Sequence, residues 1–270
     1  MIQEQTTSCL PYIPPRTPLH PLSFIPQRHL LPSLLMTVQE LGYEQTPLGE
    51  LTLRRRVEPR LDGREIFEVK LGDEYLMSSL FTESEQQLAV LGLAPLDGEL
   101  DVVIGGLGLG YTAAEALKND RVTRLLVIDL FQAVIDWHRD GLVPLGPVIS
   151  QDERCELRQG DFFGLAGTAF DTTQPTRKFD AVLLDIDHSP EHYLDEGNQS
   201  LYTASGLSAV RDQLKPGGVF ALWSNDPSDL EFTQHLSRIF GSATAHDIEF
   251  PNPYTNSISV NSVYVAQRGT

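Results

Sequence analysis

Cysteine is scarce in this sequence, since only Cys9 and Cys155 occur among 270 residues. Two cysteines are too few for a disulfide framework, and they lack the paired spacing of a zinc site. We therefore expect a protein that binds no metal and works in a reducing compartment, the cytoplasm.

Long apolar runs and an excess of basic residues are also missing. No stretch reaches the roughly 18 apolar residues that a membrane-spanning helix needs. The chain has 20 Lys and Arg against 37 Asp and Glu, which gives a formal net charge of -17. Negative charge repels phosphate backbones and anionic lipids, so we expect neither nucleic acid nor a membrane surface as partner. The 41% of hydrophobic residues can bury one full-sized core.

The first 47 residues read as a Pro-rich N-terminal extension that is ordered only in part. Seven of the 18 prolines fall within residues 1–35, and no apolar period runs through them. The prolines also interrupt any signal-peptide core. Met36 follows this segment, which fits an extension, or a misassigned start, upstream of the working protein.

Residues 48–80 are predicted to form a small β domain. The stretches ELTLRRRVE and REIFEVK alternate in the manner of strands, and Leu61-Asp62-Gly63-Arg64 between them is a turn signal. Thr82 with Glu85 three residues later matches a capping box for a helix over 84–93.

Residues 81–270 are predicted to form a nucleoside-binding domain of the α/β class. Strand-like and helix-like segments alternate there, as in a mostly parallel seven-stranded sheet covered on both faces. The expected strands are LDVVIG (100–105), RLLVID (124–129), CELRQGD (155–161), FDAVLLD (179–185), VFALWS (219–224), and two later strands over about 243–250 and 257–267.

A glycine-rich loop follows the first of these strands. Gly105, Gly106, Gly108 and Gly110 stand between an apolar strand and a helix start, where bare N–H groups favour lone pairs and negative charge. A dinucleotide fingerprint would have its third small residue where Tyr111 stands. This departure favours an S-adenosyl nucleoside, which has no pyrophosphate, over NAD.

Three further strands end in aspartate. Asp129 is placed to accept both ribose hydroxyl protons, and Asp161 to accept from an adenine amino group while Phe162 covers the ring. Asp185 ends the next strand. A single acid at a strand end is often only a helix N-cap. The ordered occurrence of all three, together with the glycine loop, favours a nucleoside site.

The segment from Asp185 to His192 is the densest group of titratable residues. His188 to His192 matches the H-x-x-E-H pattern of a zinc protease, which requires both histidines on one helical face. Pro190 stands between them and starts helices rather than continuing them. We expect a loop at the rim of the site, without metal.

With these motifs in order, residues 48–268 resemble the spermidine synthase family and its methyltransferase-fold relatives. The resemblance rests on VVIGGLGLGYTAAEAL, LLVIDLFQAVIDW, QGDFF, FDAVLLDIDHSP, YTASGLSAVRDQLKPGGVFALW and LDGREIFEVKLGDEYLMSSLF. It implies a Rossmann-like methyltransferase fold preceded by a small β-hairpin domain, an active site between them, and a homodimer. It further implies that Asp129 holds the ribose, that Asp161 holds the adenine, and that Asp185 is the catalytic acid-base residue.

Other site residues are predicted from their positions. Asp187 would add negative potential to catalysis, with His188, Tyr202 and Tyr254 contacting substrate and Trp223 as a further wall.

The chain departs from the family pattern at substrate-contacting positions. Gly108 stands where the spermidine-making members have an Asp in the loop, and His188 stands where they have a second Asp. That loop Asp would attract the ammonium of decarboxylated S-adenosylmethionine and repel the carboxylate of S-adenosylmethionine. The loop with Gly108 therefore accommodates the carboxylated donor.

Three functions remain open. The first is a spermidine synthase-like transferase that moves an aminopropyl or methyl group from S-adenosylmethionine, decarboxylated or not, to a small amine. The second is an ordinary S-adenosylmethionine-dependent small-molecule methyltransferase. The third is a non-catalytic nucleoside-binding module. The sequence does not specify the acceptor.

Overall fold

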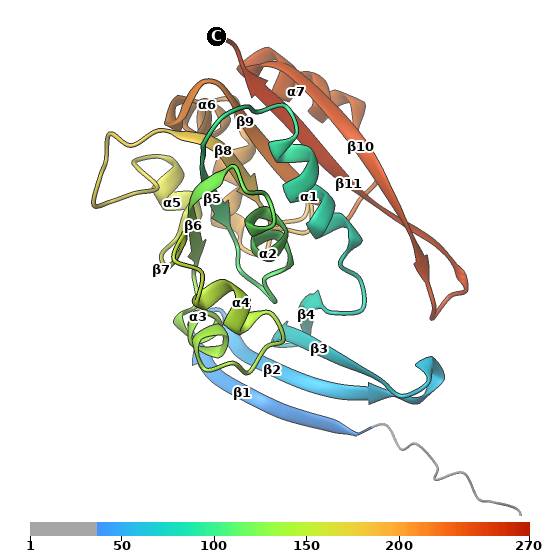
Figure 1. The fold of residues 1–270 in the computed structure, drawn as a ribbon. Helices are drawn as coiled ribbons and strands as arrows, with labels where there is room; N and C mark the ends of the chain where they lie inside the picture. The colour runs from blue at the N-terminus through green and yellow to red at the C-terminus, as the bar shows by residue number, and fades with distance from the viewer. Residues whose placement is uncertain (1–36) are drawn as a thin grey trace, which may run out of the picture. The chain divides into compact units, whose positions relative to one another are not determined.

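Two β-sheets form the frame of residues 37–270, the part of the chain that the computed structural model describes (Figure 1). Both sheets belong to one structural unit. The smaller sheet is antiparallel, with its strands in sequence order. They are β1 (Val38–Thr46), β2 (Gly49–Glu58), β3 (Arg64–Leu71) and β4 (Glu74–Ser78).

Strand β1 corrects the predicted boundary at residue 48, because it lies within the supposed extension over residues 1–47. Residues 1–36 of that extension, with Cys9, lie outside the described part of the chain. The sequence of β1 alternates poorly, and a register shift between Glu40 and Gly42 interrupts its pairing. A Cβ atom on Gly42 would come within 2.3 Å of Trp137 Nε1, so glycine lets this strand lie against the indole. A tertiary contact, rather than a local pattern, defines β1.

The predicted hairpin joins β2 to β3. A short 3-10 helix, η1 (Pro59–Leu61), leads into the turn, where Asp62 and Gly63 have φ of 54° and 77°. Asp and Gly are among the residues that adopt this left-handed region most readily.

The larger sheet has seven strands in the order β10-β11-β9-β8-β5-β6-β7. Five of them are parallel, and β11 runs antiparallel between β9 and β10. Their bounds are β5 (Leu100–Gly105), β6 (Val122–Asp129), β7 (Cys155–Gln159), β8 (Phe179–Leu184), β9 (Leu214–Ser224), β10 (Gly241–Asn252) and β11 (Ser257–Arg268).

Helices cover both faces of this sheet. One face carries α1 (Glu83–Leu93), α2 (Tyr111–Leu117), α3 (Gln132–Arg139) and α4 (Gly146–Ser150); the other carries α5 (Phe162–Ala166), η2 (Glu196–Tyr202), α6 (Ala204–Gln213) and α7 (Leu230–Phe240). Successive residues of β5 alternate between the two cores, with Val102 and Ile104 in one and Val103 in the other. Burial on both faces explains why the parallel strands are almost wholly apolar.

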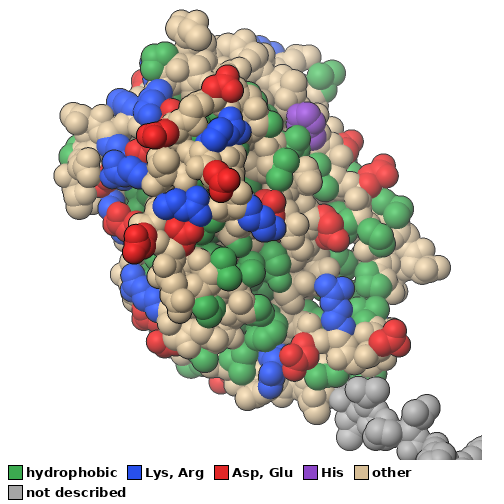
Figure 2. Space-filling view, in the orientation of Figure 1, with side chains coloured by type: hydrophobic (Ala, Val, Ile, Leu, Met, Phe, Trp, Pro, Cys, Tyr) green, Lys and Arg blue, Asp and Glu red, His purple; other side chains and the backbone are tan. Residues whose placement is uncertain are grey.

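The outer surface mixes both signs of charge on the face shown in Figure 2, where acidic and basic side chains alternate over the larger sheet and its helices. No helix within residues 37–270 combines the length and the apolar content needed to cross a bilayer.

A buried ion-pair network fixes the loop between α5 and β8. Arg177 donates to Asp171 at 2.8 Å and to Asp101 at 2.5 Å and 2.9 Å, and Arg158 donates to Asp171 at 3.1 Å. Burial alone would raise the pKa of Asp171, but hydrogen bonds from Thr173, Arg177 and Arg158 hold it well below its usual range. Asp101 lies at the start of β5, so this network stabilises the end of the sheet opposite the glycine loop.

We predict that Asp171→Asn lowers the free energy of unfolding by about 3 kcal/mol, because two arginines lose their buried charged partner. Urea denaturation of both proteins measures this difference. Glu156→Gln is the matched control, since Glu156 pairs with the same Arg158 but is 56% exposed. It should change the free energy by less than about 0.5 kcal/mol. Equal effects from both substitutions would contradict the structural role of the network.

Candidate active site

The glycine loop connects β5 to α2 through three residues with positive φ. Gly106, Gly108 and Gly110 have φ of 93°, 50° and 89°, a region where glycine is least strained. A Cβ atom on Gly106 would lie 2.1 Å from the carbonyl oxygen of Asp185, so the loop tolerates only glycine there. The Asp185 N–H donates to the Gly105 carbonyl at 2.8 Å. These backbone contacts bring the ends of β5 and β8 together.

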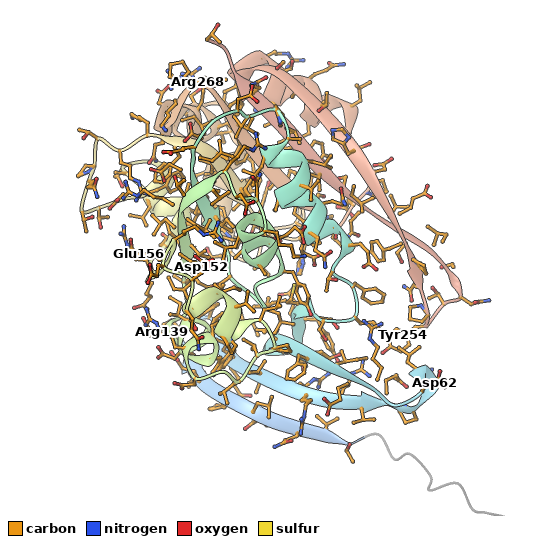
Figure 3. The ribbon with its side chains drawn as sticks, viewed as in Figure 1. Asp62, Arg139, Asp152, Glu156, Tyr254 and Arg268 are labelled. Carbon is orange, nitrogen blue, oxygen red and sulfur yellow. The ribbon has the colours of Figure 1, made fainter. Side chains whose placement is uncertain are left out.

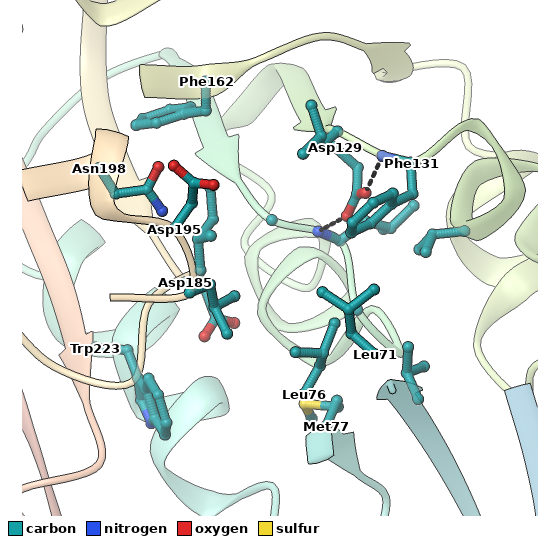
Figure 4. Close-up of a pocket in the computed structure, with 18 of the residues that line it drawn as sticks. Leu71, Leu76, Met77, Asp129, Phe131, Phe162, Asp185, Asp195, Asn198 and Trp223 are labelled. Carbon is teal, nitrogen blue, oxygen red and sulfur yellow. Dashed lines mark hydrogen bonds between the residues drawn. The ribbon is translucent and has the colours of Figure 1, made fainter. Parts of the chain in front are cut away.

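Asp129 holds the loop from the end of β6. Its two carboxylate oxygens accept the N–H groups of Leu107 and Phe131, each at 2.9 Å (Figure 4). Burial raises the pKa of Asp129, and these backbone hydrogen bonds oppose the shift. A carboxylate oxygen accepts more than one hydrogen bond, so the oxygens that orient the loop are also available to a ribose.

Asp161 and Phe162 differ in exposure. Asp161 is exposed and caps α5, accepting the Phe163 N–H at 3.0 Å. Phe162 also forms part of the cavity wall, but its ring is buried, stacks on Phe170 at 4.6 Å and fills the space over Gly105. This ring is therefore a core residue as well as a wall of the cavity, and its role as the cover of an adenine stays a prediction. The half-buried Phe163 lines the same cavity.

Asp185 lies directly below the glycine loop, where Thr112 of α2 donates to its carboxylate at 2.7 Å. Glu85 of α1 lies beside it, and its carboxylate accepts from Ser84 Oγ at 3.0 Å. The predicted capping box is wrong, because the Thr82 side chain makes no capping hydrogen bond and Glu85 is only 6% exposed.

Sequence reasoning missed Glu85 as a site residue. The signal was present: Glu85 falls on the same helical stripe as Leu88, Ala89 and Gly92, all buried. An acid on an apolar stripe of this kind is a functional candidate.

Glu85 and Asp185 form a pair of like charges within the protein. Burial and repulsion from Asp185 raise the pKa of Glu85 to about 8. Burial raises the pKa of Asp185 to about 6, although Thr112 opposes the shift. Two neighbouring carboxyls titrate together, so at neutral pH the pair holds about one proton.

These residues meet in one cavity, here called the loop cavity (Figure 4). Leu71, Leu76 and Met77 of the small sheet form its apolar wall. None of the described residues that line it is Lys or Arg. Its acidic lining residues are Glu85, Asp129, Asp161, Asp185 and Asp195, so the cavity suits a cationic ligand.

A second cavity, the hairpin chamber, adjoins the first between β4 and the β10–β11 hairpin. Four residues, Leu76, Met77, Glu85 and Trp223, line both cavities. The Trp223 indole donates to Ser84 Oγ at 2.8 Å, which fixes this predicted wall beside Glu85. Glu85 therefore lies where the two cavities meet, and Asp185 lies beside it in the loop cavity.

The predicted catalytic role of Asp187 and the substrate contact of Tyr202 are corrected. Asp187 is 1% exposed and lines neither cavity. It accepts from the Leu194 N–H at 2.9 Å, from Asn198 at 2.7 Å and from the Tyr202 hydroxyl at 2.8 Å. Asp187 is thus a positioning residue that holds the loop after β8.

His188 and Tyr254 lie outside the loop cavity. His188 lines the hairpin chamber, with its Nε2 3.0 Å from Glu74 Oε1. Tyr254 lines neither cavity, because it ties the β10–β11 hairpin to the small sheet by accepting from Arg56 at 2.6 Å and donating to Glu58 at 3.2 Å. Figure 3 shows it near the turn at Asp62. The predicted substrate contact through Tyr254 is corrected to a tether.

The family model for the spermine/spermidine synthase domain matches residues 86–244. This region carries the glycine loop and all three strand-end aspartates. The chain belongs to the spermine/spermidine synthase family. The resemblance seen in the sequence is therefore confirmed.

Curated relatives of this family match at low identity. The chain is 29% identical over 181 residues to polyamine aminopropyltransferase 2 of Pseudomonas aeruginosa. This match covers 64% of this chain and 48% of that protein. It is 30% identical over 190 residues to polyamine aminopropyltransferase of Nitrosomonas europaea. This match covers 70% of this chain and 50% of that protein. The chain spans about half the length of the curated relatives it matches.

Solved structures share the fold. A crystal structure of spermidine synthase in complex with the transition state analogue AdoDATO superposes with a TM-score of 0.66, 20% identity, and coverage of 86% of this chain and 74% of the other. Spermidine synthase from Thermotoga maritima superposes with a TM-score of 0.64 and 20% identity, and the match covers 86% of this chain and 73% of the other. The predicted α/β class, with a mostly parallel seven-stranded sheet preceded by a small β-sheet, is confirmed.

We predict that Glu85→Gln raises the free energy of unfolding at pH 9 by about 1–3 kcal/mol. The folded-state pKa of Glu85 lies above its ordinary value of 4.5, so the carboxyl releases a proton on unfolding between about pH 4.5 and 8. Stability therefore falls as the pH rises through that window, and glutamine removes this loss. Urea denaturation at pH 6 and pH 9 measures the difference.

Glu83→Gln is the control for this experiment, because Glu83 is an exposed acid on the first turn of the same helix. Repulsion from Glu83 is the weakest of the effects that raise the pKa of Glu85, so this control should change the pH dependence of stability far less than Glu85→Gln does. A Glu85→Gln variant that is no more stable than the wild type at pH 9 would refute the buried like-charge pair.

Proposed function

We propose that this chain is a transferase that moves an alkyl group from an S-adenosyl sulfonium nucleoside to a small amine, with Asp185 as the base. One observation carries the proposal: Asp185 lines the loop cavity, and its buried partner Glu85 lines both that cavity and the hairpin chamber. A donor held in the first cavity and an acceptor held in the second would meet at this pair.

The loop cavity supplies the contacts that the donor needs. Asp129 and Asp161 line it from the ends of β6 and β7, where they would accept from the ribose hydroxyls and the adenine amino group. Gly106, Gly108 and Gly110 expose the backbone beside them. The sulfonium would lie among the carboxylates, since no basic side chain lines the described part of the cavity.

The chemistry requires an unprotonated amine and a fixed approach. The amine nitrogen attacks the carbon bound to the sulfonium, a C–N bond forms as the C–S bond breaks, and the electron pair stays on sulfur as a neutral thioether. Asp185 takes the proton that the amine loses. Burial raises the pKa of Asp185, which makes its carboxylate a better proton acceptor than an exposed aspartate. Alignment of the two substrates supplies most of the remaining acceleration.

The acidic lining favours decarboxylated S-adenosylmethionine, and hence aminopropyl transfer. This donor carries two positive charges and no carboxylate, which matches five acidic side chains without a basic one. The curated relatives are named polyamine aminopropyltransferases, which agrees with this assignment.

Methyl transfer from S-adenosylmethionine is the second candidate, and Gly108 is the observation that favours it. The loop lacks a side-chain carboxylate there, so the donor carboxylate meets backbone instead of a negative charge. The predictions of a homodimer, of a cytoplasmic location and of separate β and nucleoside-binding domains rest on the family resemblance and the sequence, and they stay predictions.

We predict that Asp185→Asn lowers turnover by about 10²–10⁴-fold, because the general base is lost. Binding of the nucleoside should remain within a few-fold, since Asp129 and the loop are unchanged. Transfer assays with both donors and calorimetry with methylthioadenosine measure the two effects. Glu191→Gln, an exposed acid on the loop after β8, is the control and should retain full turnover. Full activity of Asp185→Asn would remove Asp185 from its role.

We predict that Gly108→Asp shifts donor preference about tenfold toward the decarboxylated nucleoside, a change of about 1.4 kcal/mol. The site accepts the side chain, because Asp tolerates a φ of 50° and its Cβ would lie 3.7 Å from Met77 Cγ. Calorimetry with both donors measures the ratio. Gly98→Asp is the matched control, a glycine at φ 75° in open space outside both cavities. An unchanged ratio in Gly108→Asp would show that position 108 does not read the donor carboxylate.

A further inference from the structure

Acidic side chains in the hairpin chamber are confined to one end. Glu85, which shares the charge of the carboxyl pair with Asp185, lies at the junction with the loop cavity, and no other acid lines the described part of the chamber. The remaining polar side chains are neutral amides and hydroxyls, apart from His188, whose Nε2 already contacts Glu74. The β10–β11 hairpin contributes Asn252, Ser259 and Asn261 to the chamber wall, together with the ring of Phe250.

The neutral side chains of the hairpin lie at increasing distance from the carboxyl pair along β11. The side-chain amide of Asn261 lies 2.9 Å from Ser84 Oγ, which in turn contacts Glu85. Ser259 lies two residues earlier in the strand, on the same face and about 7 Å farther on. Asn252 donates to Ser259 Oγ at 3.1 Å. An acceptor that places its amine at Glu85 thus extends toward Asn252.

Positive charge lies behind the opposite wall of the chamber. The Tyr75 ring lines it, and Lys70 Nζ and Arg54 Cζ lie 5.0 Å and 5.1 Å from the centre of that ring. Arg54 is paired with Glu68 at 2.7 Å, so Lys70 supplies the uncompensated charge. Lys70 would repel a second ammonium inside the chamber, where no carboxylate other than Glu85 lines the described part.

We propose that the acceptor carries one amino group and an uncharged hydrogen-bonding group, such as an alcohol or amide, at its other end. This inference rests on the proposed amine alkylation. The amine lies at the carboxyl pair, and the neutral end contacts Asn252 and Ser259. A diamine of the same length is disfavoured, because its second ammonium would meet only amide and hydroxyl groups, with Lys70 behind the Tyr75 ring.

Binding in the presence of saturating methylthioadenosine tests the proposal without depending on turnover. The probes are 4-aminobutanol, 1,4-diaminobutane and 4-aminobutanoate, measured by calorimetry on the full chain. We expect the amino alcohol to bind at least tenfold more tightly than the other two. Transfer assays with the same amines and both donors then report whether the bound amine reacts.

Asn252→Asp is the decisive variant. The new carboxylate can still accept the Tyr254 N–H that Asn252 accepts at 3.0 Å, and Ser259 can reverse its hydrogen bond and donate. We expect this variant to gain about tenfold in affinity for the diamine relative to the amino alcohol. Asn256→Asp, with the same charge change in the turn of the same hairpin but outside the chamber, should leave the ranking unchanged.

The outcomes separate this inference from the proposed function. Tighter binding of the diamine or of 4-aminobutanoate to the wild type, an unchanged ranking in Asn252→Asp, or no binding of any amine would overturn the inference. The expected ranking without any transfer would support the chamber assignment and refute the transferase proposal. Efficient transfer with diamines as the best acceptors would support the transferase and refute the inference.

Discussion

Backbone contact between the ends of β5 and β8 is the constraint on which the site depends. Gly106 leaves no room for a side chain against the Asp185 carbonyl, and the Asp185 N–H is bound to Gly105. The nucleoside loop and the proposed base therefore form one rigid corner. Asp129 binds the loop from the other side, so the donor site is fixed by strand pairing.

Burial of two carboxyls in this corner couples stability to function. Burial raises the pKa of both Glu85 and Asp185, and repulsion from Asp185 raises that of Glu85 further. A sulfonium donor bound beside them would offset that repulsion. Ligand binding would therefore also raise the free energy of unfolding. Active sites commonly hold such local instability, and here the ion pairs of Asp171 and Arg177 at the opposite end of the sheet counterbalance it.

Strand-end chemistry was readable from the sequence, whereas loop and hairpin contacts were not. The apolar runs predicted the parallel strands, and the rule that ligands lie at their carboxyl ends located Asp129, Asp161 and Asp185. Strand β1 was missed because Trp137, distant in sequence, defines it. Asp187 was predicted to act in catalysis, and Tyr202 and Tyr254 to contact substrate, from their positions in the sequence. In the folded chain each binds partners that the sequence does not reveal. Glu85 was missed because its spacing from Thr82 also matches a helix capping box, which assigned it a purely local role.

Tyr254 ties the β10–β11 hairpin to the small sheet, so the two cavities of the site are built by different parts of the chain. Parallel strand ends build the loop cavity, the proposed donor site, while the tip of a hairpin, held to β2 through Arg56, forms a wall of the hairpin chamber beside it. Substitutions in that tip alter one wall without disturbing the glycine corner. Relatives with the same fold can therefore diverge in what they modify while keeping the group that they transfer, and exchanging hairpin tips between them is a direct route to new acceptor specificity.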